Sequence, residues 1–227
     1  RPNPNGHYVD GPILDLNYSN FVGMHPVPIV HGMTVGEYAK MINGEGWLSK
    51  GVQCDLKVIP VENYTHQTAY ELPIKPSPNL PNATAINLYP SLCLFEGTNV
   101  SMGRGTELQF QIFGSPFLKS VDYRYEFTPK PNVGAKYPVH ENKICTGLNL
   151  KDHSILSQIE LKWLLDAYQN TENKAEFFNP FFTKLAGQKL LQEQIEMGMT
   201  SDQIRDSWKT DLERYKLLRA PYLLYPL

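Results

Sequence analysis

The stretch LPIKPSPNLP, residues 72–81, divides the sequence into two unequal parts. Four of its ten residues are proline. Each proline fixes its own φ angle and holds the residue before it in an extended conformation. The stretch therefore predicts a stiff connector, and we place a Pro-rich boundary at residues 73–82. Residues 1–72 and 83–227 are then expected to form two domains.

The part before the connector shows the pattern of a fragment of an α/β domain. Residues 1–33 are rich in Pro, Gly and Asn, which is typical of a long irregular segment. Thr34 and Glu37 fit a capping box, so a helix is predicted to begin there and to end at one of the next two glycines. Residues 54–61 predict a strand. One helix and one strand make part of an α/β domain, and too little for a whole one.

The part after the connector predicts a mixed α+β domain with helices at its C-terminal end. Apolar or alternating segments predict strands at residues 83–95, 108–113, 121–127 and 136–139. Residues 128–152 otherwise show no regular pattern. Apolar residues at helical spacing predict helices over residues 155–167, over residues 184–197 and after Thr200. Asp152 or Ser154 would cap the first of these, and Thr200 with Gln203 forms a second capping box.

The composition excludes several classes of protein. The chain has 227 residues, of which 41% are hydrophobic and 19% charged, and its formal net charge is −2. A nearly neutral chain has no electrostatic reason to bind nucleic acid or an anionic membrane. No apolar run approaches the roughly 18 residues of a membrane span. Three cysteines lie outside any CxxC pair, so a zinc site is not indicated, and one disulfide or three thiols are both possible.

The stretch LFEGTNVSMGRGT, residues 94–106, has the composition of a ligand site. Its glycines allow close approach of the backbone to a ligand. Glu96 could act as an acid, a base or an acceptor for sugar hydroxyls, and the planar guanidinium of Arg104 could hold a carboxylate. Alternatively, the stretch is an ordinary hairpin loop in which Glu96 and Arg104 pair with each other. It is not a phosphate-binding loop, because GxxxxGK[ST] is absent.

Several stretches resemble, in the same order, segments of one protein family. They are RPNP at residues 1–4, FVGMHP at 21–26, HGMTVGE at 31–37, SPNLP at 77–81, FEGTNVSMGRGT at 95–106, FGSP at 113–116, and Trp208 with YLLY at 222–225. Because the match keeps its order over nearly the whole chain, the sequence is identified as a member of the NamZ-type exo-β-N-acetylmuramidase family. The resemblance implies the C-terminal portion of a Rossmann-like α/β domain in residues 1–72, followed by an auxiliary domain, with the sugar bound between them.

The resemblance also implies a function. It predicts an exo-acting glycoside hydrolase that releases N-acetylmuramic acid from the non-reducing ends of peptidoglycan fragments, without a cofactor or metal, and exported to the periplasm or beyond. The family's upstream half, with a PEHG-like glutamate as the expected catalytic acid, is not found in this sequence. We therefore expect a missing N-terminal portion of the same protein as a partner.

The predicted site combines the residues of the Glu96 stretch with polar residues of the other matched segments. Glu96 is the candidate catalytic residue. The candidate substrate-binding residues are Arg104, Asn99, Thr106, Arg1, Asn3, His25, His31, Ser77 and Asn79. Ser77 and Asn79 could equally cap the connector. Tyr89 could stack on a sugar, although a place in the core is the stronger expectation.

A non-catalytic module that binds cell-wall glycan is the alternative. Two carboxylates that face each other across the pocket would indicate an enzyme, whereas one carboxylate paired to Arg104 would indicate a binding protein. A nucleotide-dependent Rossmann enzyme is not favoured, because its glycine fingerprint is absent.

Overall fold

Both predicted capping boxes form in the computed structural model of the chain, which describes residues 1–227. The backbone amide of Thr34 donates to the carboxylate of Glu37 over 2.7 Å, and helix α1 (Val35–Gly44) begins there. Thr200 and Gln203 make the corresponding contacts at the start of α6 (Ser201–Arg219). These contacts join residues three positions apart, which is why the sequence could predict them.

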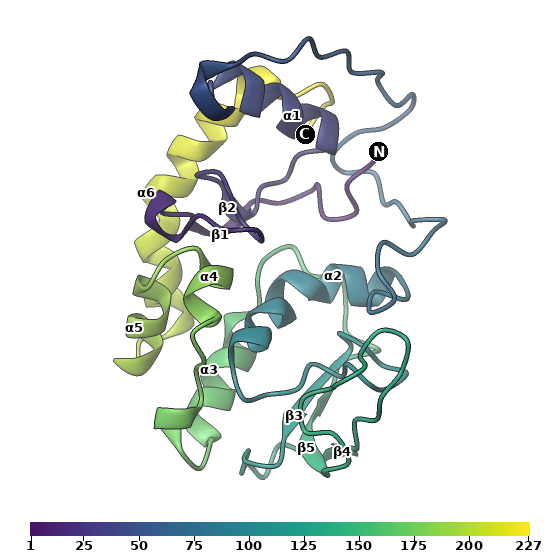
Figure 1. Ribbon diagram of the computed structural model, residues 1–227, viewed down its shortest axis with the longest axis vertical. Helices are drawn as coiled ribbons and strands as arrows, with labels where there is room; N and C mark the ends of the chain where they lie inside the picture. The colour runs from purple at the N-terminus through teal and green to yellow at the C-terminus, as the bar shows by residue number, and fades with distance from the viewer.

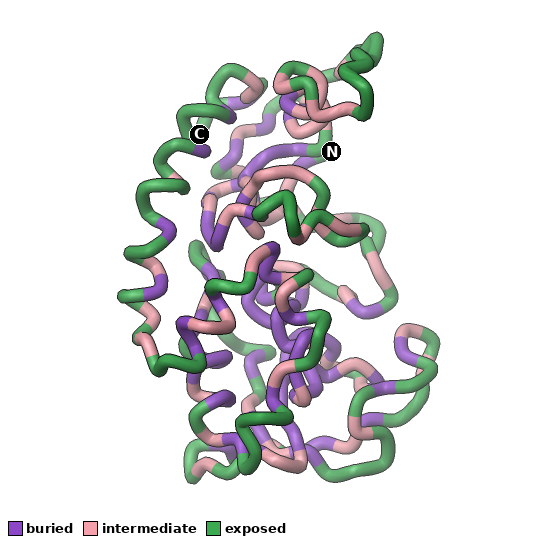
Figure 2. The backbone as a smooth tube through the Cα atoms, turned by 60° about the vertical axis from the view of Figure 1, so that its left-hand side comes forward, coloured by how far each residue is buried: buried purple, intermediate pink, exposed green.

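The long helix α6 ties the two ends of the molecule together (Figure 1). Its 19 residues span about 28 Å at the rise of an α-helix. Ile204, Trp208 and Tyr215 are buried on one face, as predicted, while most of the helix faces solvent (Figure 2). Arg205 also pairs with the buried Asp10 over 2.8 Å. The helix thereby holds the N-terminal strand β1 (Asp10–Ile13) against the C-terminal part of the chain.

The strands form two small antiparallel sheets. The first pairs β1 with β2 (Pro28–Val30), and the second has the order β3-β5-β4. The three strands of the second sheet are β3 (Ile112–Ser115), β4 (Tyr125–Phe127) and β5 (Cys145–Asn149). Every pairing is antiparallel, so residues 1–72 do not form a parallel Rossmann-like sheet by themselves. The chain has a mixed α/β fold with six α-helices.

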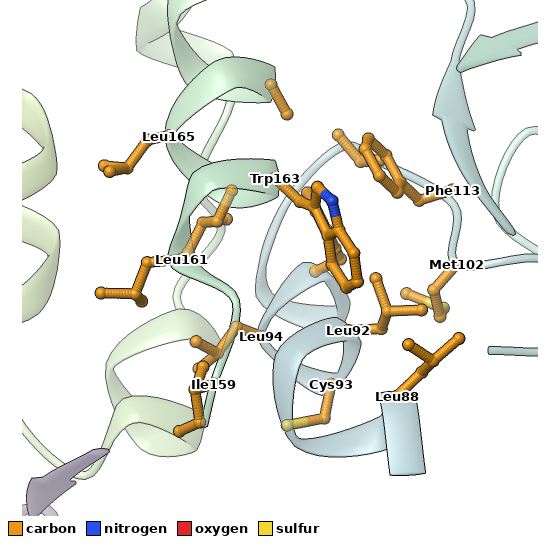
Figure 3. Packing of buried hydrophobic residues seen from close by; sticks show 14 of the residues in the cluster. Leu88, Leu92, Cys93, Leu94, Met102, Phe113, Ile159, Leu161, Trp163 and Leu165 are labelled. Carbon is orange, nitrogen blue, oxygen red and sulfur yellow. The ribbon is translucent and has the colours of Figure 1, made fainter. Parts of the chain in front are cut away.

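The prediction of a strand over residues 83–95 was wrong. Residues Ala83–Leu92 form helix α2, and Cys93–Gly97 form the 3₁₀ helix η3. The side chain of Asn82 caps α2 by accepting the amide of Ala85 over 2.9 Å. A short apolar run suits a buried helix as well as a strand, because both bury side chains on all sides. Leu88, Leu92 and Leu94 pack in the main core with Trp163 and Phe113 (Figure 3).

Other predicted elements shift or disappear. Residues 54–61 and 136–139 form no strand, since no neighbouring strand pairs with them, whereas the irregular region contains β5 at the centre of its sheet. The predicted helix over residues 155–167 begins later, as α3 (Leu161–Asn170), with Glu160 as its cap in place of Asp152 or Ser154. The region of the helix predicted over residues 184–197 forms two helices, α4 (Phe182–Ala186) and α5 (Leu190–Glu196), and Gly187, at a φ of 72°, ends the first of them.

The remaining elements are short. Four further 3₁₀ helices are Leu16–Tyr18, Ser49–Gly51, Lys174–Glu176 and Ala220–Tyr222. All three cysteines are free thiols, which settles the alternative that the sequence left open. None of the helices has the length and hydrophobicity that crossing a bilayer requires.

Candidate functional site

Glu96 and Arg104 form an ion pair at the centre of the candidate site. Glu96 lies in η3, directly after α2, and Arg104 lies in the loop that follows. An Nη1 hydrogen of Arg104 is donated to Oε2 of Glu96 over 2.7 Å. The side chains are 21% and 37% exposed, respectively. The guanidinium makes no other hydrogen bond to the protein, so its remaining N–H groups and the second oxygen of Glu96 are available to a ligand.

The backbone around this pair is fixed by close packing against α4. A Cβ atom at Gly97 would lie 2.4 Å from the Cα atom of Phe182, so only glycine fits there. On the other side of Arg104, the hydroxyl of Thr106 donates to the carbonyl of Gly103 over 2.7 Å and accepts the amide of Leu108 over 3.0 Å. These contacts constrain the backbone next to each member of the ion pair.

The environment of Glu96 shifts the pKa of its carboxyl group. Burial raises its pKa, and the charge and hydrogen bond of Arg104 oppose that shift. Burial dominates, so the carboxyl group gains a proton more readily than an isolated glutamate. The group can therefore serve either as a hydrogen-bond acceptor or as a proton donor to a bound ligand.

The ion pair lines a cavity of about 560 Å³. The opposite parts of the wall come from the β1–β2 region, the connector and α4, so residues distant in sequence meet there. Of the predicted substrate-binding residues, this cavity brings together Arg104, His25, His31, Ser77 and Asn79 with Glu96. Its volume lies within the range of about 300–1,000 Å³ that is usual for small-molecule sites.

The other predicted residues lie outside this cavity. Arg1 is exposed, and the side chain of Asn3 donates to the carbonyl of Met33 over 2.9 Å. Thr106 stabilises its own turn. Asn99 offers its carbonyl to Ser115 and His140, and its buried side-chain oxygen has no partner. Asn3, Thr106 and Asn99 thus make structural contacts within the protein.

The two histidines of the cavity enclose an aromatic group. His31 stacks on Tyr38 with ring centroids 4.9 Å apart, and Nδ1 of His25 lies 2.8 Å from the Tyr38 hydroxyl. Burial, followed by the charge of Arg219, lowers the pKa of His31 to about 4. Burial also lowers the pKa of His25. Both rings are neutral at pH 7 and can exchange hydrogen bonds with a polar ligand. No three His, Cys, Asp or Glu side chains gather in a way that could hold a metal ion.

Two aromatic residues complete the wall beside the ion pair. Tyr89 is 38% exposed, and Phe110 packs against it with ring centroids 4.9 Å apart. Phe110 has a φ of 52°, a strained conformation for a bulky residue, and strained residues cluster at ligand sites. Nothing in the sequence marked Phe110 as a residue of the site. The apolar run around Tyr89 suggested a core residue, because only the tertiary structure exposes one side of its ring.

Glu96 is the one carboxylate that lines the cavity, and it is paired to Arg104. The arrangement matches the pairing that the sequence offered as an alternative to a free catalytic carboxylate. Fold and site together define a mixed α/β protein with a pocket of small-molecule size, lined by an ion pair and by aromatic residues beside it.

The chain belongs to the NamZ family. Residues 87–225 match the C-terminal part of exo-beta-N-acetylmuramidase NamZ, and residues 1–84 match its N-terminal part. Because both parts match, the expectation that the catalytic half is missing finds no support. The chain is 32% identical over 247 aligned positions to peptidoglycan beta-N-acetylmuramidase NamZ of Bacillus subtilis (strain 168), covering 99% of this chain and 58% of that protein.

Two crystal structures of DUF1343 family proteins from Bacteroides fragilis NCTC 9343 have the same fold. One is 55% identical, with a TM-score of 0.96, and the match covers 100% of this chain and 65% of that one. The other is 24% identical, with a TM-score of 0.79 over 99% of this chain and 65% of that one, and supports the fold alone. The chain therefore spans less than two thirds of the length of the relatives it matches.

Proposed function

We propose that the protein acts on peptidoglycan glycan as an exo-acting glycoside hydrolase, releasing N-acetylmuramic acid from non-reducing ends. Membership of the NamZ family supports the substrate class. The structural observation that carries the proposal is the ion pair of Glu96 and Arg104 on the wall of the 560 Å³ cavity. A pocket of this size suits a terminal sugar, as an exo mode of action requires.

The chemistry of the wall suits muramic acid in particular. The lactyl ether of muramic acid carries a carboxylate, and the free N–H groups of Arg104 can bind a carboxylate through two parallel hydrogen bonds. The second oxygen of Glu96 can accept the acetamido N–H or a hydroxyl. The exposed side of Tyr89 offers an apolar face to the sugar ring.

The role of Glu96 within this proposal is to hold the substrate and to assist protonation of the leaving oxygen. Glycoside hydrolysis by the usual route needs two carboxyl groups. The cavity of this chain contains one, whose pKa is raised by burial. That single carboxyl group favours a second candidate, a non-catalytic module that binds cell-wall glycan.

The proposed division of the chain follows the same reasoning. We infer that residues 1–72 are the C-terminal portion of a Rossmann-like domain and that residues 83–227 form the auxiliary domain. Residues 73–82 are then the connector between the two. The cavity supports this division, because it is lined from both sides of the connector. An action on cell-wall glycan would require export to the periplasm or the cell exterior.

The test compares hydrolysis and binding in one set of variants. Release of 4-nitrophenol from its β-N-acetylmuramide measures catalysis, and calorimetry measures the affinity for N-acetylmuramic acid and N-acetylglucosamine. Arg104→Met should remove the preference for N-acetylmuramic acid, since N-acetylglucosamine lacks the lactyl carboxylate. Arg124→Met is the matched control, because Arg124 is exposed and outside the cavity.

The outcomes separate the two candidates. If release of 4-nitrophenol falls at least about tenfold in Glu96→Gln but persists in Glu107→Gln, the hydrolase is supported. Glu107 is the control because it is exposed and does not line the cavity. Binding of N-acetylmuramic acid without release supports the binding module. A folded chain that binds neither sugar contradicts both.

A further inference from the structure

A second cavity, of about 340 Å³, shares Glu96 and Arg104 with the first. The ion pair is thus part of the wall of both cavities. The rest of the second wall comes from Ser101 and Met102 and from residues 134–139. A ligand that contacts the ion pair from the first cavity and is longer than one sugar can extend into the second cavity.

The backbone of the loop 129–140 is fixed at several points. Its Lys130 amide donates to the carbonyl of Gly105 over 2.8 Å, and the carbonyl of Gly134 accepts the side chain of Asn79 over 2.8 Å. Pro138 packs so closely on Gly105 that a Cβ atom there would lie 2.7 Å from the Cβ of Pro138. Because Gly105 follows Arg104 directly, this packing sets the position of the loop relative to the ion pair.

Two side chains of this fixed loop have no partner within the protein. The ring of Tyr137 is 91% exposed and contacts no other aromatic ring. Lys136 is exposed and forms no ion pair. Both residues line the second cavity. A rigid loop that presents an unpartnered aromatic ring and a cation beside a charged pair has the features of a preorganised binding surface.

We propose that the second cavity is a subsite for the next sugar of the glycan, an N-acetylhexosamine, whose ring stacks on Tyr137. Lys136 donates hydrogen bonds to hydroxyl or acetamido oxygens of this sugar. The glycan then places one sugar in each cavity and contacts the ion pair between them. This inference rests on the proposed function, because it assigns the substrate's second residue to a particular part of the same site.

Calorimetry with a monosaccharide and a disaccharide tests the subsite without requiring catalysis. The ligands are the methyl β-glycoside of N-acetylmuramic acid and the disaccharide N-acetylmuramyl-β-1,4-N-acetylglucosamine, with Glu96→Gln as the background if the chain hydrolyses them. We expect the disaccharide to bind about tenfold more tightly than the monosaccharide. Tyr137→Ala should abolish this gain and leave monosaccharide affinity unchanged, while Tyr137→Phe should preserve it.

Val133→Ala is the matched control. Val133 lies on the same loop, is 95% exposed and does not line the cavity. Truncation of its side chain should therefore leave the affinities for both ligands unchanged. Equal affinity for the two ligands, or a Tyr137→Ala variant that weakens both or neither, overturns the subsite while the proposed function stands. Failure to bind either ligand overturns the proposed function and the subsite with it.

Discussion

The Nε2 atom of His66 lies 3.0 Å from Oε1 of Glu37, and both side chains are completely buried. The same oxygen of Glu37 accepts the backbone amide of Leu224 over 2.7 Å. Its other oxygen accepts the amide and the hydroxyl of Thr34. One carboxylate thus joins the start of α1, the segment around His66 and the C-terminal tail.

Removal of this carboxylate should strongly destabilise the fold. Glu37→Gln places an N–H group where a donor already points, so the free energy of unfolding should fall by about 3 kcal/mol. Urea unfolding followed by circular dichroism measures this change. Glu213→Gln is the control, because it removes a solvent-exposed pair with Lys216 and should have no measurable effect. Equal stability of Glu37→Gln and the unmodified chain would contradict the structural role.

The stability should also depend on pH through the same carboxylate. Burial alone would raise the pKa of Glu37, but hydrogen bonds from His66, Leu224 and Thr34 together hold it at about 2. A carboxyl group whose pKa is lower in the folded state stabilises the fold above its unfolded pKa, near 4.5. This contribution, about 3 kcal/mol, should disappear as the pH falls from 4.5 to 2.

His31 should add a second loss of stability on acidification, in a pH interval above that of Glu37. Its folded pKa of about 4 lies below the ordinary value of 6.5, so the unfolded chain binds the proton more readily between these values. The free energy of unfolding should therefore decrease as the pH falls from 6.5 to 4. His31→Asn, which can still accept the amide of Met33, should flatten this interval. An unchanged slope in that variant would exclude His31 as its source.

Gly97 should be intolerant of even one additional carbon atom. In Gly97→Ala the new Cβ would meet the backbone of Phe182, so η3 and α4 would have to separate. We expect a loss of at least about 2 kcal/mol in the free energy of unfolding, together with weaker ligand binding at Glu96. The control is Gly198→Ala, which has a φ of 75° but open space around it, and should lose about 1 kcal/mol. Equal losses would show that steric contact with Phe182 is unimportant.

The ring of Tyr89 should contribute to affinity in the first cavity. Its exposed side faces the cavity, and Phe110 supports the ring from within the core. Tyr89→Ala should weaken binding of N-acetylmuramic acid by about tenfold, whereas Tyr89→Phe should change it little. Calorimetry with both variants, after circular dichroism has confirmed their folds, makes this comparison. A large loss in Tyr89→Phe would assign the effect to the hydroxyl group instead.

Local sequence determined where α1 and α6 begin, and it placed two oppositely charged residues, Glu96 and Arg104, close together in the chain. Thr34 with Glu37, and Thr200 with Gln203, complete their hydrogen bonds within a single turn. Glu96 and Arg104 are eight positions apart in one glycine-rich segment, so they are close enough in the chain for their pairing to be considered from the sequence. Such features are readable because the interacting groups are neighbours in the chain.

The tertiary structure decided the features that depend on distant partners. Residues 54–61 have strand-like composition but no neighbouring strand, and β5 occupies the middle of a sheet although its sequence has no regular pattern. The apolar run before Glu96 became α2 because Asn82 caps it and the core packs around it. Backbone groups of a strand need hydrogen bonds from another segment, and the sequence does not say which segment will supply them.

The same division applies to the site. The sequence by itself determined which residues carry charge and hydrogen-bonding groups, among them Glu96, Arg104 and His31. The tertiary structure alone decided that His31 and Tyr89 face one cavity with the ion pair, and that Asn3 and Thr106 instead stabilise turns and loops. A side chain's chemistry is fixed by its residue type, whereas its neighbours and its pKa follow from burial and from contacts between segments far apart in the chain.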